Sequence, residues 1–272
     1  MSLGILFITT GLKLGGAERM LQSLLVRLSN RGYRVKVCSL GEGGRVGEEL
    51  IRDGIDVEYI GFRKRIGDVV KLASLGRAIR QFDPDIVQTW MYHADLVGGV
   101  TAKLSSRAPV LWAVRQSDLD RRQSKRLTRW VVTLNVWLSR WVPSQVVYCA
   151  EYASRVHRDL GYRSTLGQVI HNGCDTEVFY QHKAGGQTIR RQLGLDDAVP
   201  VVGHAGRWDP QKDYPTLISA IRHISRSVPD AVFLLVGPDI DTSNSKLMQL
   251  IGTSGTSNIY LMGPSECMAD FY

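Results

Sequence analysis

The chain has 272 residues, of which 44% are hydrophobic, so it can bury a sizeable core, and its length suggests two domains of about 150 residues each. Its formal net charge is +8, and this charge is unevenly distributed. Residues 191–272 contain 6 Lys and Arg against 9 Asp and Glu, which leaves 28 of the 34 basic and 17 of the 26 acidic residues in 1–190. The first part therefore carries +11 and the second −3, which favours an anionic partner for the first part.

Several function classes are disfavoured by what the sequence lacks. It has no helix-turn-helix signature, no aromatic RNP pattern and no Cys or His spacing for zinc, so we expect no nucleic-acid partner. No apolar run reaches 18 residues, and no charged region precedes the first apolar run, so we expect neither a membrane span nor a signal peptide. Single, scattered cysteines predict reduced thiols and a cytoplasmic location; they are Cys38, Cys149, Cys174 and Cys267.

In chain order, short β-rich runs alternate with amphipathic segments over residues 1–174. The predicted strands are 3–9, 34–40, 56–60, 85–90, 109–114 and 145–149, with a short one at 168–170. The predicted helices are about 17–30, 45–53, 67–82, 94–105, 121–141 and 151–160. This alternation predicts an α/β domain built on a doubly wound parallel sheet.

The regular pattern lapses over 175–198, which we interpret as a linker with a short helical stretch at 188–193. It resumes in 199–272, which we interpret as a second, smaller domain of the same kind. Its predicted strands are 200–205, 231–236 and 258–262, and its predicted helices are 214–227 and 243–251.

The first strand leads into a glycine-rich turn, GLKLGGAER, at residues 11–19. Gly15 and Gly16 permit positive φ and a close approach of the backbone to a ligand at the start of a helix. A dinucleotide fingerprint would need Gly-x-Gly-x-x-Gly and an acidic residue closing the second strand, but that strand ends in Cys38-Ser39-Leu40. The turn therefore argues against NAD.

A second turn, GRWDPQKDY at residues 206–214, follows the apolar run that ends at Ala205. Arg207 and Lys212 stand where a buried strand gives way to a helix, at the sheet edge where α/β proteins bind ligands. We expect an anion site there; the alternative is that both are solvated loop charges.

These segments, together with HNGCDTEVF at 171–179 and FLLVGP at 233–238, resemble the GT-B glycosyltransferases of family 4. The resemblance runs nearly end to end with the motifs in order. It implies two Rossmann-like domains and transfer of a sugar, with retention, from a nucleotide-diphospho-sugar to a saccharide or lipid-linked acceptor, in cell-surface polysaccharide or glycolipid synthesis. Arg207 and Lys212 match the diphosphate-binding pair of the family, and Gly15 and Gly16 match the loop that approaches the donor phosphate. We expect no cofactor and no metal, because these cations stabilise the departing diphosphate.

The acceptor side is expected where the fourth and fifth strands end. The fourth ends in QTWMYHAD, which places Trp90, Tyr92 and His93 at that edge; aromatic faces there suit sugar or lipid, and His93 is a candidate catalytic group. Many relatives have a His after the fifth strand, whereas this chain has Arg115 and Asp118, which suit a polar or anionic acceptor.

The segment 121–141 combines a basic start with large apolar residues at helical spacing. An interfacial membrane helix has this pattern, but a crossover helix must also cover its sheet. We expect the Trp and Leu side chains to pack onto the sheet, and the basic cluster alone to meet an anionic membrane surface at the inner face of the membrane. That cluster is Arg121, Arg122, Lys125 and Arg126.

The second domain is short for its type, and the family's pair of Glu residues eight positions apart, which holds the donor, has no counterpart there. Glu42 and Glu49 are seven positions apart, close to this spacing, but they stand in the first domain, so we treat the similarity as coincidence. We expect the chain to be a truncated form with impaired activity. The alternatives are a non-catalytic relic that binds a nucleotide or partner, or another GT-B-like enzyme such as a sugar-nucleotide epimerase or a phosphorylase.

Overall fold

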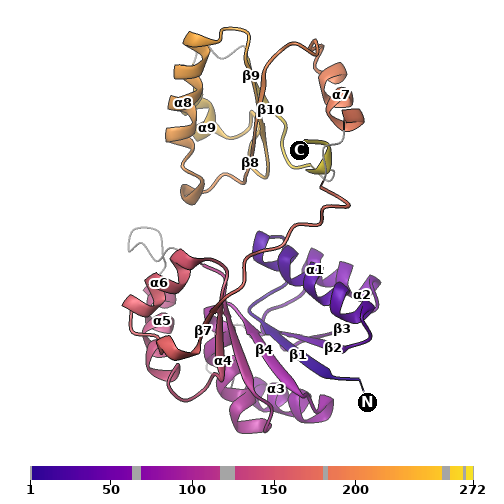
Figure 1. Cartoon of the computed structure of the whole chain (residues 1–272), viewed down its shortest axis with the longest axis vertical. Coiled ribbons are helices and arrows are strands. Elements are labelled where there is room, and N and C mark those ends of the chain that lie inside the picture. The colour runs from indigo at the N-terminus through magenta and orange to yellow at the C-terminus, as the bar shows by residue number, and fades with distance from the viewer. Residues whose placement is uncertain are drawn as a thin grey trace. The chain divides into compact units, whose positions relative to one another are not determined.

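The computed structural model describes residues 2–62, 69–116, 126–179, 183–252, 258–265 and 268–271. The chain divides into two compact units, Met1–Gly173 and Cys174–Tyr272 (Figure 1). Each unit has its own parallel sheet with helices on both faces.

The first unit contains a seven-stranded parallel sheet in the order β3-β2-β1-β4-β5-β6-β7. The strands are β1 (Gly4–Thr9), β2 (Arg34–Ser39), β3 (Asp56–Tyr59), β4 (Ile86–Trp90), β5 (Val110–Val114), β6 (Gln145–Tyr148) and β7 (Gly167–Val169). The strand order reverses between β1 and β4, the arrangement at which doubly wound sheets open a crevice at their carboxyl ends. The predicted α/β fold class is confirmed.

Helices cover both faces of this sheet (Figure 1). They are α1 (Gly16–Asn30), α2 (Arg45–Arg52), α3 (Val69–Phe82), α4 (Tyr92–Ser105), α5 (Arg126–Leu138) and α6 (Glu151–Asp159), with a 3-10 turn at Ser164–Leu166. Residues of α1 and α2 share one core cluster with Ile5 and Phe7, whereas α3 to α6 share the other with Leu6 and Ile8. Successive side chains of β1 thus point to opposite faces, as the period of a strand requires.

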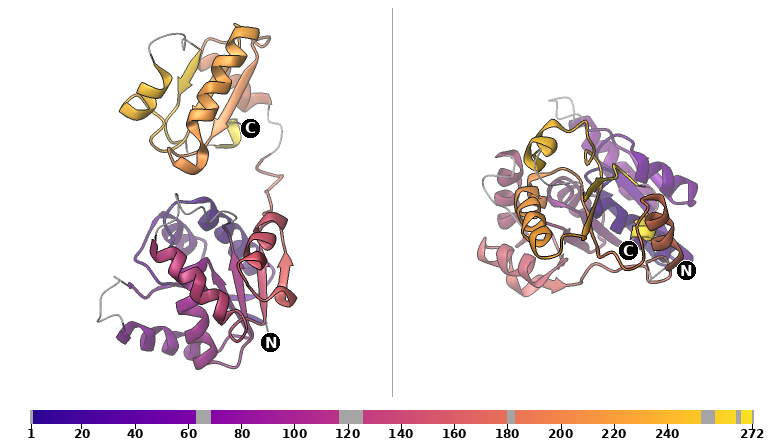
Figure 2. Two further views of the ribbon diagram at one scale, coloured as in Figure 1. Left: turned by 90° about the vertical axis from the view of Figure 1, so that its left-hand side faces the viewer. Right: turned by 90° about the horizontal axis from the view of Figure 1, so that it is seen from above.

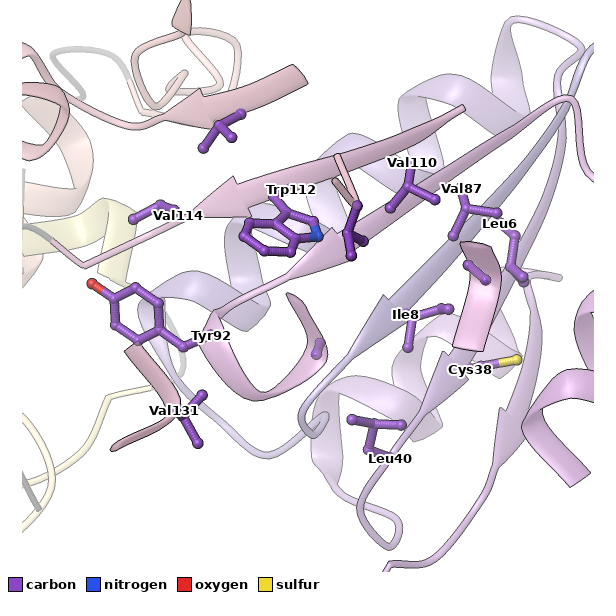
Figure 3. Packing of buried hydrophobic residues seen from close by; sticks show 14 of the residues in the cluster. Leu6, Ile8, Cys38, Leu40, Val87, Tyr92, Val110, Trp112, Val114 and Val131 are labelled. Atoms are coloured by element: carbon purple, nitrogen blue, oxygen red, sulfur yellow. The ribbon is translucent and has the colours of Figure 1, made fainter. Parts of the chain in front are cut away.

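The larger of these two clusters contains Trp112 of β5 and Tyr92 of α4 (Figure 3). Both rings are buried, Trp112 completely and Tyr92 with 3% of its surface exposed. Burying an aromatic ring contributes about 1.5–3 kcal/mol relative to leaving it exposed. Tyr92 therefore belongs to the core of the first unit, contrary to the expectation that it faces a ligand.

The second unit has a three-stranded parallel sheet in the order β10-β9-β8. Figure 2 shows the chain from two further sides, with the second unit in orange and yellow. Its elements are α7 (Lys183–Gln192), β8 (Val201–Ala205), α8 (Tyr214–Ser227), β9 (Val232–Val236), α9 (Ser245–Ile251) and β10 (Ile259–Leu261), with 3-10 turns at Pro210–Lys212 and Met268–Phe271. Phe233 and Leu235 face α8 and α9, whereas Val232 and Leu234 pack against Ile189 of α7. The segment interpreted as a linker thus contains a helix that covers one face of this sheet.

The expectation that the Trp and Leu side chains of α5 pack onto the sheet is wrong for the tryptophans and for Leu134, and only Leu138 packs against the core. Trp130, Trp137 and Trp141 are 70%, 63% and 68% exposed. The buried side of α5 is formed instead by Val131, Val132 and Asn135, whose amide donates a 2.9 Å hydrogen bond to the carbonyl of Tyr92. Small β-branched residues allow α5 to lie close to the layer beneath it, and the tryptophans lie on the opposite side.

Candidate functional site

The carboxyl edge of the second sheet carries the turn that joins β8 to α8. The amide of Gly206 donates to Val236 and the amide of Trp208 to Pro238, so the turn is hydrogen-bonded to the end of β9. Gly237 has φ of +149°, and a Cβ there would lie 2.6 Å from the carbonyl carbon of Gly206. Only glycine permits this conformation and this approach, so the backbone around Gly206 has a fixed position.

Arg207 and Lys212 both lie on this turn with exposed side chains. The guanidinium of Arg207 contacts the carboxylate of Asp209, with 3.0 Å between Nε and Oδ2. The aliphatic part of Lys212 lies over Gly206, where its Cδ would be 3.3 Å from a Cβ. The sequence prediction that these two cations share one strand-to-helix turn is confirmed at the level of placement, and their role stays a prediction.

Acidic side chains accept hydrogen bonds from backbone amides at this edge of the sheet. Asp213, with φ of +49°, caps α8 by accepting a hydrogen bond from the amide of Thr216, and Asp209 accepts one from the amide of Gln211. The bond from Gln211, together with the nearby charge of Arg207, lowers the pKa of Asp209. An anion binding here would therefore be recognised mainly by the side chains of Arg207 and Lys212, rather than by the amides of α8.

Two aromatic groups beneath the turn were not identified from the sequence. The hydroxyl of Tyr214 donates a 2.6 Å hydrogen bond to the carbonyl of Gly206. The ring of His204 meets that of Tyr214 edge-on at 5.4 Å, and its buried Nε2 has no hydrogen-bond partner among the described residues. Burial and the charge of Lys212 lower the pKa of His204, which favours its neutral form. In the sequence, His204 falls at the end of a predicted strand. No local signal there indicates that its ring packs beside the turn that carries Arg207.

The glycine-rich turn of the first unit leads into α1 without positive φ at Gly15 or Gly16. Gly15 is the N-cap, with extended backbone angles of −168° and 165°, and a Cβ on it would contact the carboxylate of Glu18. A Cβ on Gly16 would meet no atom within 4 Å. The expectation of positive φ is therefore wrong. The open space at Gly16 leaves room for a ligand to approach the backbone.

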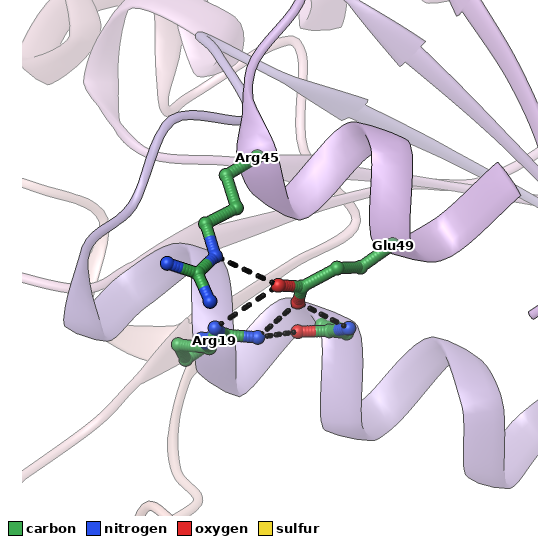
Figure 4. A network of polar contacts seen from close by, with 4 residues as sticks. Arg19, Arg45 and Glu49 are labelled. Carbon is green, nitrogen blue, oxygen red and sulfur yellow. Dashed lines mark hydrogen bonds and ion pairs between the residues drawn. The ribbon is translucent and has the colours of Figure 1, made fainter. Parts of the chain in front are cut away.

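Behind this turn, α1 and α2 are joined by an ion-pair network (Figure 4). The carboxylate of Glu49 accepts hydrogen bonds from Arg19, Gln22 and Arg45. Burial alone would raise the pKa of Glu49, but these bonds lower it. Arg19 of the GGAER motif and Glu49 thus form a structural pair between two helices.

Trp90 supports Arg115 at the carboxyl ends of β4 and β5. The indole N–H of Trp90 donates a 3.0 Å hydrogen bond to the carbonyl of Ala17 in the first turn of α1. The guanidinium carbon of Arg115 lies 4.4 Å from the centroid of the Trp90 ring, and an N–H of Arg115 donates to Oδ1 of Asn172. Burial lowers the pKa of Arg115, but a guanidinium stays charged at neutral pH. Trp90 is only 2% exposed, so its face is covered, contrary to the expectation of a sugar-binding face.

Of the remaining acceptor-side candidates, the structure describes Tyr92 and His93. The hydroxyl of Tyr92 lies 2.6 Å from Nε2 of buried His157, deep in the core. His93 is half-buried in the first turn of α4, and Asp118 lies outside the described residues, as do Arg121, Arg122 and Lys125.

Met91, between β4 and α4, has φ of 75° and ψ of 157°, a conformation that is otherwise almost confined to glycine. Such strain concentrates at functional sites, and this residue lies at the end of β4, where the strand order reverses.

Two negative findings concern only the described parts of the chain. There, no set of three or more His, Cys, Asp or Glu side chains is arranged to hold a metal ion. None of the helices seen there has both the length and the apolar character needed to cross a bilayer.

Solved structures share this fold. Alr3699/HepE from Anabaena, in complex with UDP-glucose, is 21% identical, with a TM-score of 0.81 over 99% of this chain and 71% of that chain. A glycosyltransferase from Rickettsia africae is 16% identical, with a TM-score of 0.78 over 100% and 70% of the two chains. A UDP-N-acetylglucosamine 2-epimerase from Rickettsia bellii is 11% identical, with a TM-score of 0.58 over 100% and 71%. At these identities the likeness establishes the fold alone, and the fold includes both transferases and an epimerase.

The family assignment comes from the sequence. No curated protein matches the chain. The family model described as Glycosyltransferase Family 4 matches residues 14–178, from the glycine-rich turn past the end of the first unit. This match covers more than half of the chain, which therefore belongs to glycosyltransferase family 4.

Proposed function

We propose that the chain transfers a sugar from a nucleotide-diphospho-sugar to a saccharide or lipid-linked acceptor, with retention at the anomeric carbon, in the synthesis of a cell-surface polysaccharide or glycolipid. Membership of the family supports the transferase class. The UDP-glucose bound to the Anabaena protein of the same fold supports the donor class. The observation that carries the proposal is the turn after β8, which holds Arg207 and Lys212 on a fixed backbone.

In this proposal, Arg207 and Lys212 bind the diphosphate and stabilise the negative charge that it gains as the sugar departs. Cations already in place cost no reorganisation at the moment of reaction, and removing one comparable group typically slows a reaction about 10²–10³-fold. The carboxylate of Asp209 orients Arg207 through the 3.0 Å contact. In the first unit, the backbone at Gly15 and Gly16 is proposed to approach a donor phosphate. Two side-chain cations perform the charge neutralisation here, so we propose no metal.

The acceptor is proposed to meet the carboxyl edge of the first sheet. Arg115, held by Trp90 and Asn172, suits a polar or anionic group. His93 and Asp118 remain proposed partners for its hydroxyl groups. The buried ring of Trp90 is the surface on which Arg115 lies, and Tyr92 belongs to the core of the first unit.

We further propose a cytoplasmic, peripheral association of the first unit with the inner face of the membrane. Its excess of basic residues supports this, as does the cluster of Arg121, Arg122, Lys125 and Arg126, which ends at the first residue of α5.

The donor assignment is tested with the full chain, UDP and UDP-glucose. Calorimetry measures binding, and release of UDP measures turnover. We expect Arg207→Ala and Lys212→Ala to weaken UDP binding and to lower turnover about 10²–10³-fold. Binding of uridine, which has no phosphate, should change little, because the lost contacts are to phosphate.

Arg226→Ala and Lys246→Ala are matched controls, because they remove the same charges from exposed positions on α8 and α9. Wild-type UDP affinity in both turn variants would remove Arg207 and Lys212 from the donor site. UDP binding without transfer to any acceptor would favour the non-catalytic alternative.

A further inference from the structure

The exposed side of α5 carries a continuous apolar row. Its members follow one another at intervals of three or four residues, so they share one face of the helix. They are Leu127, Trp130, Leu134, Trp137 and Trp141. Trp141 lies just past the last helical residue, and hydrogen bonds from the amides of Trp141 and Val142 to Leu138 continue the helical path.

Such a surface is unusual for a side that faces solvent. Tryptophan is highly buried on average, and a monomer rarely exposes contiguous apolar patches larger than a few hundred Å². The other side of α5 already packs on the core through Val131 and Val132. The apolar row is therefore not needed to attach α5 to its own unit.

The charges beside the row indicate what covers it. Arg126 and Arg140 have exposed side chains at positions next to the row along the helical path. Residues 121–141 contain no Asp or Glu. A helix with Trp and Leu on one side and arginines beside them suits a lipid surface, where indole rings lie at the headgroup level and arginines meet phosphates. A second copy of the chain would bring a unit with the same +11 charge against it, which electrostatic repulsion disfavours.

We propose that α5 lies in the interface of an anionic bilayer, with Trp130, Trp137 and Trp141 inserted among the headgroups and Arg126 and Arg140 on lipid phosphates. This proposal rests on the peripheral membrane association proposed above, and it adds apolar insertion to the attraction between charges. Attachment comes from apolar insertion as well as charge, so part of it persists when salt screens the arginines.

The test uses the full chain with vesicles of phosphatidylcholine, with and without phosphatidylglycerol. Flotation measures the partition coefficient, and quenching of tryptophan fluorescence by brominated phosphatidylcholine measures insertion. Trp90 and Trp112 are buried and serve as an unquenched background. We expect binding to anionic vesicles, quenching of fluorescence, and a residual bound fraction at high salt.

Replacing Trp130, Trp137 and Trp141 together by Ser should lower the partition coefficient at least about tenfold and abolish the quenching. Replacing Arg126 and Arg140 together by Gln should weaken the preference for phosphatidylglycerol, with about a fivefold loss per charge. Leu134→Gln should cost about fivefold. Its matched control is Ile51→Gln on α2, which covers the other face of the sheet; the two residues are 48% and 52% exposed.

Light scattering and UDP calorimetry on every variant separate the outcomes. Unquenched fluorescence, or unchanged partitioning of the triple Trp variant, overturns the insertion. A dimer that the triple Trp variant abolishes, without vesicle binding, overturns it in favour of self-association. Loss of vesicle binding with wild-type UDP affinity supports the membrane surface. Failure to bind UDP with intact vesicle binding rejects the donor proposal alone.

Discussion

The hydroxyl of Tyr214, the first residue of α8, donates a 2.6 Å hydrogen bond to the carbonyl of Gly206, the residue before Arg207. This bond joins the helix to the turn that carries both candidate diphosphate ligands. Burial of the phenol raises its pKa to about 12, so it remains a donor throughout the physiological range.

We expect Tyr214→Phe to lower the free energy of unfolding of the second unit by about 1 kcal/mol, because the carbonyl of Gly206 loses its partner. The turn should also become less well positioned, so the affinity for UDP should fall. Chemical denaturation and calorimetry measure the two effects. Tyr260→Phe in β10 is the control, and equal effects of both changes would remove any special role of the bond to Gly206.

A second prediction concerns the close approach of Gly237 to the same turn. Gly237→Ala should lower the free energy of unfolding by about 2 kcal/mol or more, because φ of +149° is strained for alanine and its Cβ would meet the backbone of Gly206. UDP affinity should fall with it, since the turn must move. Gly203→Ala in β8 has open space at its Cβ and should be tolerated. If Gly237→Ala unfolds and binds UDP like wild type, the turn is not fixed by this contact.

Much of this fold could be predicted because buried parallel strands are short apolar runs bounded by Gly, Pro and polar residues. The run 232–236 follows this pattern and is buried throughout, whereas the run ending at Ala205, expected to be buried, forms a partly exposed edge strand. The position of the turn that carries Arg207 and Lys212 could also be predicted, since the carboxyl end of a strand fixes where the next loop begins. Hydrogen bonds between turns, such as that from Tyr214, depend on tertiary approach and leave no local signal.

The errors have equally specific causes. Periodicity showed that α5 has a Trp and Leu face, but it could not show which face meets the sheet. The structure buries Val131, Val132 and Asn135 instead. At the end of β4, the aromatic side chains of Trp90 and Tyr92 suggested a surface that binds a ligand. Each has a polar tip with a hydrogen-bond partner, the carbonyl of Ala17 or the ring of His157, and that pairing lets it lie inside the unit.

A third prediction concerns the pair that joins α1 to α2. Glu49→Gln should lower the free energy of unfolding of the first unit by about 0.5 kcal/mol, because Arg19 and Arg45 lose a shared anion at a partly exposed site. The difference should shrink as salt is added. A double-mutant cycle with Arg19→Gln isolates the coupling between the two residues. A coupling that does not respond to salt would mean that packing, rather than charge, joins these helices.

The last prediction concerns His157, whose ring lies in the core among Tyr92, Tyr148 and Tyr162. Burial lowers the pKa of His157 below its ordinary value of 6.5, so the folded chain holds it neutral. As the pH falls below 6.5, the unfolded chain takes up the proton first, and stability is lost. Asp95 acts in the opposite direction, because burial raises the pKa of its carboxyl group.

His157→Gln keeps an acceptor for the Tyr92 hydroxyl and removes the titration, while Asp95 is present in both proteins and cancels in their difference. We therefore expect the stability advantage of wild type over His157→Gln to be largest above about pH 7 and to shrink as the pH falls through the lowered pKa of His157. Urea unfolding of both proteins at a series of pH values measures this. A constant difference across the series would mean that His157 has the same pKa in the folded and unfolded chains.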